Sequence, residues 1–186
     1  MDGDGQNYSV FNSRMLVDTV GDITDEALKA SRIKDVIGVL VGRVFNWSQR
    51  KSLFPLHLGI KCCALEMAAA GASRFDAERF GVFFRSSPRQ CDVLLVNGPI
   101  SKKFADPIVR LWEQMPEPKW GIAMGEWAIS GGPYFRSYNI LEGVDTLIPV
   151  DVNIPGCPPR PEALMDGFDK LRQKIIRIGA APDDAA

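Results

Sequence analysis

Two adjacent cysteines, Cys62 and Cys63, and a third in a proline-rich turn, Cys157, are the residues of this sequence best suited to chemistry. Neighbouring residues have Cα atoms roughly 3.8 Å apart, whereas a disulfide needs a Cα separation of roughly 5.5 Å. A bond between Cys62 and Cys63 would therefore strain the peptide that joins them. The pair is better suited to offering two thiolates to one metal centre, so we expect a metal site.

The spacing of these cysteines narrows the kind of metal site. Thiolate-rich sites select iron–sulfur clusters, zinc or copper. Zinc fingers and ribbons use paired Cys-x-x-Cys or Cys/His sets, and bacterial ferredoxins use a local Cys-x-x-Cys-x-x-Cys run. Neither pattern occurs around the three cysteines. The sequence therefore favours a cluster whose ligands come from distant loops of one domain.

Apolar segments typical of strands alternate along the chain with segments that have helical periodicity. Strands are predicted at 56–60, 92–96, 120–124 and 147–152, and helices at 24–44, after the cysteine pair, at 104–115 and from Pro161 to 175. Such alternation predicts the α/β class, with a parallel sheet flanked by helices. Ligands of such sheets collect at the carboxyl ends of the strands.

The predicted strands place the three cysteines and the fourth, Cys91, at opposite edges of the sheet. Cys62, Gly125 and Cys157 each follow a predicted strand, so we expect them at one rim. Cys91 instead precedes the strand 92–96, and five strand residues span roughly 17 Å at about 3.3 Å each. Cys91 is therefore predicted to be a small buried residue at the far end.

The domain organisation is predicted to be simple. Residues 1–23 are expected to form a flexible N-terminal arm, 24–178 a single α/β domain with an N-terminal surface helix, and 179–186 a disordered tail. In the helix at 24–44, basic side chains flank an apolar stripe. Two interpretations of this stripe stay open: packing on the domain's own core, or contact with a partner or a membrane surface.

Composition and missing motifs exclude several function classes. A formal net charge of −1 gives no basic field for nucleic acid. No Gly-x-Gly-x-x-Gly or Walker loop occurs, so we expect no nucleotide bound by this chain. No Gly-x-Ser-x-Gly motif supports nucleophilic catalysis. No apolar run approaches the roughly 20 residues that span a bilayer, and the acidic, polar start is unlike a signal peptide.

Six motifs together resemble one family. They are Cys-Cys-Ala-Leu-Glu-Met at 62–67, the segments 73–81, 85–90, 113–120 and 148–152, and Pro-Gly-Cys-Pro-Pro-Arg-Pro-Glu-Ala-Leu at 155–164. From 46 to 176 the sequence resembles the B subunit (PSST type) of respiratory complex I, the NADH–quinone oxidoreductase, and of related F420H2 dehydrogenases. The resemblance implies a flavodoxin-like sheet, similar to the small subunit of nickel–iron hydrogenases.

The resemblance also implies a function. Such subunits carry a 4Fe–4S cluster that passes electrons from the hydrophilic arm of the complex to quinone. Their partners are other complex I-type subunits: a partner similar to a hydrogenase large subunit, which completes the quinone pocket, and the membrane-arm subunits. We therefore expect a peripheral protein on the cytoplasmic side of a bacterial or archaeal membrane. Met67 matches a family position that faces the quinone pocket, and an ordinary core methionine is its alternative interpretation. Glu66 follows the cysteine pair by one helical turn, and two roles stay open for it: tuning the cluster or donating protons near quinone, or a charge at the helix start.

The resemblance implies four cysteine ligands, and this chain supplies three of them. Cys62, Cys63 and Cys157 match, but the family's Met-Gly-x-Cys-Ala reads Met-Gly-Glu-Trp-Ala here, with Trp127 in place of the third thiolate. Indole is a hydrogen-bond donor only, so Trp127 cannot ligate iron.

Four explanations of this departure stay open. In the first, Glu126 is the fourth ligand. In the second, the cluster has one iron fewer, or it takes its fourth ligand from a partner or from water. In the third, the chain is a structural paralogue that docks partners without a normal 4Fe–4S cluster, and in the fourth, Trp127 is a sequence variant of this copy.

Overall fold

The structure of the protein is a computed structural model that describes residues 31–180, with side chains described at 38 and 40–177. The strands are β1 (Pro55–Leu58), β2 (Val93–Asn97), β3 (Trp120–Met124) and β4 (Val152–Ile154). The α-helices are α2 (Ser31–Lys51), α3 (Lys61–Gly71), α4 (Lys102–Glu113), α5 (Glu126–Ser130) and α6 (Pro161–Ala180). The arm predicted at 1–23 and the predicted helix start at Thr24 lie outside the described residues.

The four strands form one parallel sheet in the order β1-β2-β3-β4. Every residue of β2 is buried, as its apolar run predicts for a strand covered on both faces. A fifth segment, 82–85, lies outside β1 through parallel bridges from Leu53 to Val82 and from Leu56 to Arg85. Counting this segment second in chain order, the spatial order is 2-1-3-4-5, that of flavodoxin-like sheets. The predicted fold class is confirmed.

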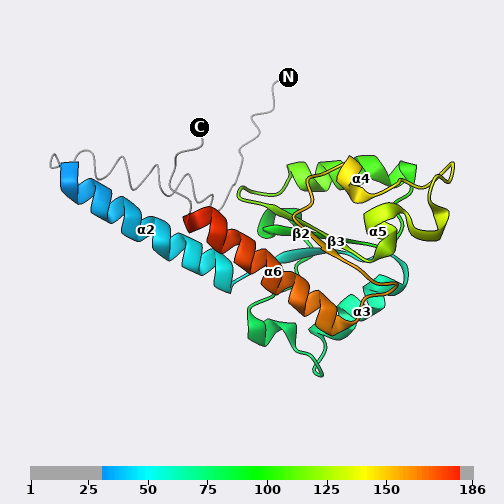
Figure 1. The fold of residues 1–186 in the computed structure, drawn as a ribbon, viewed down its shortest axis with the longest axis horizontal. Coiled ribbons are helices and arrows are strands. Elements are labelled where there is room, and N and C mark those ends of the chain that lie inside the picture. The colour runs from blue at the N-terminus through cyan, green and yellow to red at the C-terminus, as the bar shows by residue number, and fades with distance from the viewer. Residues whose placement is uncertain (1–30, 181–186) are drawn as a thin grey trace, which may run out of the picture.

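The helices cover both faces of the sheet (Figure 1). One core cluster holds Cys63, Met67 and Phe168, and it lies between the sheet and helices α3 and α6. The other holds Ile108 and Ala128, and it lies between the sheet and helices α4 and α5. Because parallel strands need a crossover after each strand, this wrapping leaves all the carboxyl ends at one edge.

The prediction for the last strand was wrong in its bounds. The segment 147–151 is not a strand, and β4 begins only at Val152. The carbonyl of Val144 accepts hydrogen bonds from the backbone N–H groups of Leu147 and Ile148, which draws the chain into a turn. Pro149 then has no N–H to donate to a ladder. Local turn bonds therefore replace the sheet pairing that the apolar run suggested.

Helix α2 extends beyond the sheet beside α6 (Figure 1). Its side chains Leu40, Val44 and Trp47 follow one another at helical spacing and are 61%, 56% and 57% exposed. These three side chains therefore do not pack on the domain's own core. No helix among residues 31–180 is long and apolar enough to cross a membrane.

Candidate metal centre at the carboxyl edge of the sheet

The cysteine pair stands at the start of α3, directly after β1. Ile60 is extended, with φ −124° and ψ 129°, and Lys61 opens the helix with a left-handed φ of 56°. This sharp turn puts Cys62 and Cys63 in the first helical turn, where Cys62 is exposed and Cys63 is buried. Cys157 lies three residues after β4 and is exposed. The three predicted ligands therefore lie at the carboxyl edge of one sheet.

Gly125, at the end of β3, lets the cysteine loops approach each other. Its φ is +87°, and an added Cβ would lie 2.8 Å from the Cys63 sulfur and 3.3 Å from the Gly156 carbonyl oxygen. The backbone N–H of Gly125 donates to Ile154, and that of Glu126 donates to Gly156, both at 2.8 Å. These contacts hold the loop that carries Cys157 against the buried thiol.

The surroundings of Cys63 keep its thiol protonated. Its pKa is raised to about 11, mainly by burial and then by the charge of Cys62, a hydrogen bond with Cys62 and the charge of Cys157. The backbone N–H of Gly98, at the end of β2, opposes this by lowering the pKa. Deprotonating such a group of thiols needs a compensating positive charge, which a metal centre provides.

Trp127 lies against Cys157. Its indole Nε1 donates a hydrogen bond to the Cys157 sulfur over 3.1 Å. The ring is only 9% exposed. The Tyr134 ring packs against it at a centroid distance of 4.9 Å, and the Lys61 ammonium lies 4.5 Å from its centroid. The position where the resemblance implies a thiolate therefore carries a hydrogen-bond donor to a neighbouring sulfur.

The remaining predicted site residues lie around this centre without joining the thiols. The Glu126 side chain is exposed, and Glu66 is partly exposed. Met67 is buried in the core, where the Asn97 amide nitrogen lies 3.4 Å from its sulfur. Within residues 31–180, no three His, Cys, Asp or Glu side chains are arranged to hold one metal ion. A cluster places its irons at separate corners, so its ligand sulfurs stand farther apart than around a single ion.

Cys91 lies where the sequence predicted, at the start of β2 and away from the carboxyl edge. It is buried, and its thiol donates to the Ser87 carbonyl oxygen over 3.0 Å. Burial raises the pKa of this thiol to about 12.

The side chains at the carboxyl edge of the sheet fit a thiolate-ligated iron–sulfur centre at three positions. They do not fit a centre with four protein thiolates.

Sequence reasoning missed Asn97, which ends the otherwise apolar strand β2. It is fully buried, and its Oδ1 accepts a hydrogen bond of 2.7 Å from the backbone N–H of Ile60. An amide at the end of a buried apolar run was the available signal, because a buried polar side chain needs partners.

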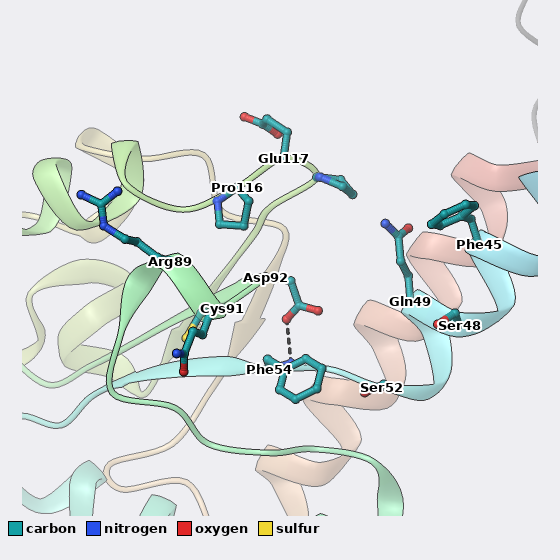
Figure 2. A pocket seen from close by; sticks show the side chains of 12 residues that line it. Phe45, Ser48, Gln49, Ser52, Phe54, Arg89, Cys91, Asp92, Pro116 and Glu117 are labelled. Carbon is teal, nitrogen blue, oxygen red and sulfur yellow. Dashed lines mark hydrogen bonds between the residues drawn. The ribbon is translucent and has the colours of Figure 1, made fainter. Parts of the chain in front are cut away.

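A cavity of about 420 Å³ lies at the amino end of β2, with Cys91 in its lining and away from Cys62, Cys63 and Cys157. Figure 2 shows Asp92 between the end of α2 and the loop of Pro116 and Glu117. One oxygen of Asp92 accepts a hydrogen bond of 2.7 Å from the backbone N–H of Phe54. Burial raises the pKa of Asp92 to about 6, although backbone hydrogen bonds oppose the shift. No part of the predicted metal site reaches this cavity.

Comparisons with known proteins agree with the geometry. The B subunit of the NADH-quinone oxidoreductase of Heliobacterium modesticaldum is 54% identical over 161 residues, which cover 86% of this chain and 90% of that protein. A chain of the membrane-bound sulfane sulfur reductase, an archaeal respiratory membrane complex, aligns with a TM-score of 0.69 and 42% identity, covering 72% of this chain and 76% of that chain.

A chain of an NAD⁺-reducing [NiFe]-hydrogenase aligns over 66% of this chain and 92% of its own length, with 18% identity and a TM-score of 0.47, a likeness too weak to carry an argument. Residues 61–171 match the family described as NADH ubiquinone oxidoreductase, 20 Kd subunit. Since that match spans more than half of the sequence and the Heliobacterium relative is similar over most of both chains, this chain belongs to the family of NADH ubiquinone oxidoreductase 20 Kd subunits.

Proposed function

We propose that this protein is the electron-transfer subunit of a membrane-bound NADH-quinone oxidoreductase-like complex, and that it holds an iron–sulfur cluster through Cys62, Cys63 and Cys157. One observation carries the proposal. Cys62 and Cys63 follow β1 and Cys157 follows β4, so all three lie at the carboxyl edge of a parallel sheet. The backbone of Gly125 lies close to both the Cys63 sulfur and the Gly156 carbonyl oxygen beside Cys157. That edge is where open α/β sheets bind their ligands.

An iron–sulfur cluster supplies reversible one-electron redox chemistry. The residues of this chain set the conditions for it. Cys63 is a buried ligand, which excludes water from one side of the centre. The N–H groups of Gly98 and Trp127 are donors to Cys63 and Cys157. Hydrogen bonds and burial are the means by which proteins tune a cluster potential.

The finer assignments follow the family. We propose that quinone is reduced next to this chain, near Met67 and Glu66, in a pocket completed by a partner similar to a hydrogenase large subunit. The electrons would come from the hydrophilic arm of the complex. Membrane-arm subunits would hold the protein peripherally at the cytoplasmic side of the membrane, with the exposed stripe of Leu40, Val44 and Trp47 available for contact.

Iron and sulfide analysis of the purified, intact complex tests the proposal. Cys157→Ala should lower the iron and sulfide content of the complex and remove one cluster signal from its electron paramagnetic resonance spectrum. Electron flux to quinone should fall while the subunit composition on a native gel stays the same. Equal iron content in the wild-type and Cys157→Ala complexes would show that this chain holds no cluster.

Cys91→Ala is the matched control, because it removes a buried thiol at the opposite edge of the sheet. Its iron content, spectrum and electron flux should equal those of the wild type. A loss of iron in Cys91→Ala similar to that in Cys157→Ala would mean that removal of any thiol disturbs the fold, and would contradict the assigned ligand set.

A second candidate function is a structural paralogue that docks the partner subunits without carrying electrons. The contact of Trp127 with Cys157 favours it, since an indole stands in contact with one of the three thiols. This candidate expects unchanged flux in Cys157→Ala and a loss of assembly on shortening the loop of Arg85 and Arg89. Loss of flux in an assembled Cys157→Ala complex excludes it.

A further inference from the structure

We propose that the carboxyl edge of the sheet binds a three-iron, 3Fe–4S cluster. Cys62, Cys63 and Cys157 each ligate one iron, and the Trp127 side chain occupies the corner of the site where a fourth iron would lie. The inference deepens the proposed function and rests on it. It concerns which cluster the chain selects, and it follows from the number of donors and from the packing of the Trp127 side chain.

The count of sulfur and imidazole donors allows three iron ligands at this edge. The sequence contains four cysteines and one histidine. Cys91 lies two residues before β2, at the opposite edge, and its thiol donates to the Ser87 carbonyl oxygen. The histidine, His57, lies within β1, and its Nδ1 is 3.0 Å from the carbonyl oxygen of Arg85 in the outer segment of the sheet. Neither side chain lies with the three thiols.

The carboxylate next to Trp127 does not complete the set. Glu126 and Trp127 are consecutive in α5, so their side chains point about 100° apart around the helix axis. The Trp127 side chain is the one that turns inward to Cys157, while that of Glu126 is exposed.

The indole is held in place on several sides. Its Nε1 donates to Cys157, and the Tyr134 ring packs against it. A Cβ added at Gly132 would lie 3.2 Å from the indole ring, a tight contact, so the backbone of Gly132 lies close against the ring. A buried ring with these contacts cannot swing away without losing both a hydrogen bond and apolar packing. The volume beside Cys157 is therefore already filled.

Charge also disfavours a fourth iron at this corner. The Lys61 ammonium lies 4.5 Å from the centroid of the Trp127 ring and 5.6 Å from that of Tyr134. A cation in this place repels an iron cation and attracts the net negative charge of a cluster with three thiolates. Donor count, packing and charge thus point to the same three-iron centre.

Electron paramagnetic resonance of the intact complex in its oxidised state is the decisive measurement. An oxidised three-iron cluster is paramagnetic, whereas oxidised two-iron and conventional four-iron clusters are silent, so clusters of partner subunits do not interfere. The wild-type complex should show one oxidised-state signal per copy of this chain. The signal should be absent from Cys157→Ala and present in Cys91→Ala.

Two substitutions at 127 sharpen the test. Trp127→Cys adds a thiol, empties the corner, and should convert the cluster to a four-iron one: the oxidised-state signal disappears and the complex gains one iron per chain. Trp127→Phe keeps a ring in the corner without the N–H donor, and should retain the oxidised-state signal and the wild-type iron content.

The outcomes separate this inference from the proposed function. A wild-type complex without an oxidised-state signal, whose iron content nevertheless falls by four per chain in Cys157→Ala, overturns the three-iron cluster and leaves the electron-transfer function standing. Equal iron in wild type and Cys157→Ala overturns both. Because the wild-type spectrum decides the first question, the inference stays testable if Trp127→Cys fails to assemble.

Discussion

Asn97 at the end of β2 is bonded to Ile60, the residue that precedes the helix of the cysteine pair. Its Oδ1 accepts the Ile60 N–H at 2.7 Å, and its amide nitrogen lies 3.4 Å from the sulfur of Met67. Asn97 is fully buried, and it is the one polar residue among the buried ones in the described part of the chain. It therefore joins β2 to the residue before α3 and to the interior of α3, the helix whose first turn carries Cys62 and Cys63.

Asn97→Ala should destabilise the protein and loosen the site. Removing the acceptor leaves the Ile60 N–H unpaired, which costs about 1–3 kcal/mol. Chemical denaturation measures the free energy of unfolding, and iron analysis of the complex measures the effect on the site. Asn153→Ala is the matched control, because Asn153 is an exposed asparagine of β4. It should change stability by less than about 0.5 kcal/mol; equal effects of the two substitutions would refute the role of Asn97.

Gly125→Ala should destabilise the protein and disturb the cysteine site directly. The added Cβ meets the Cys63 sulfur at 2.8 Å, and the φ of +87° is strained for any residue with a side chain. We expect a loss of about 1–3 kcal/mol in the free energy of unfolding, together with loss of iron from the complex. A Gly125→Ala protein with wild-type stability and iron content would show that the Cys63 sulfur has room to move.

Gly42→Ala should have the opposite effect on stability. Gly42 is inside α2, and a Cβ added there meets no atom within 4 Å. Alanine in a helix interior is favoured over glycine by about 0.5–1 kcal/mol. The melting temperature of the purified chain should rise by a few degrees. A lower melting temperature would mean that the open side of Gly42 is covered in solution.

Asp92→Asn should flatten the pH dependence of stability. The pKa of Asp92 is raised from 3.8 to about 6 in the folded protein. Between these values the unfolded chain has lost a proton that the folded protein keeps, so this group makes the protein less stable as the pH rises from about 4 to about 6. The whole effect amounts to about 3 kcal/mol at most and persists above pH 6.

The difference between the wild type and Asp92→Asn isolates this group, because all other carboxylates are shared. The Asn side chain still accepts the Phe54 N–H through its Oδ1, as the neutral acid does. Denaturation at several pH values from 4 to 7 should show that the free energy of unfolding of the variant, relative to that of the wild type, increases up to about pH 6. Above pH 6 this difference should stay constant. A difference that does not vary with pH would contradict the raised pKa.

Trp127→Phe should lower the reduction potential of the centre. The N–H that donates to the Cys157 sulfur stabilises the more negative, reduced state. Losing a hydrogen bond worth about 1 kcal/mol lowers a one-electron potential by roughly 40 mV. Redox titration followed by electron paramagnetic resonance measures it. Tyr134→Phe keeps the tilted ring that packs beside Trp127 and should leave the potential unchanged. An unshifted potential in Trp127→Phe would contradict a role for the hydrogen bond.

Much of this architecture could be predicted from local sequence. The apolar runs at 92–96 and 120–124 are strands within one residue of the prediction, because a short run buried on both faces carries its own signal. The order of strands and helices then placed Cys62, Cys63 and Cys157 at one edge and Cys91 at the other, since parallel strands share their carboxyl ends. These inferences need only chain order and the rise per residue.

Tertiary structure decided what surrounds the thiols. The contacts of Trp127 with Cys157 and of Asn97 with Ile60 join residues 30 and 37 positions apart. No periodicity encodes such contacts, because they depend on how the loops of separate strands meet. The same holds for β4, whose apolar run was drawn into a turn by the Val144 carbonyl. The sequence by itself determined the fold class, the edge of the sheet and the three thiols; packing decided that the indole of Trp127 faces Cys157 and donates to its sulfur.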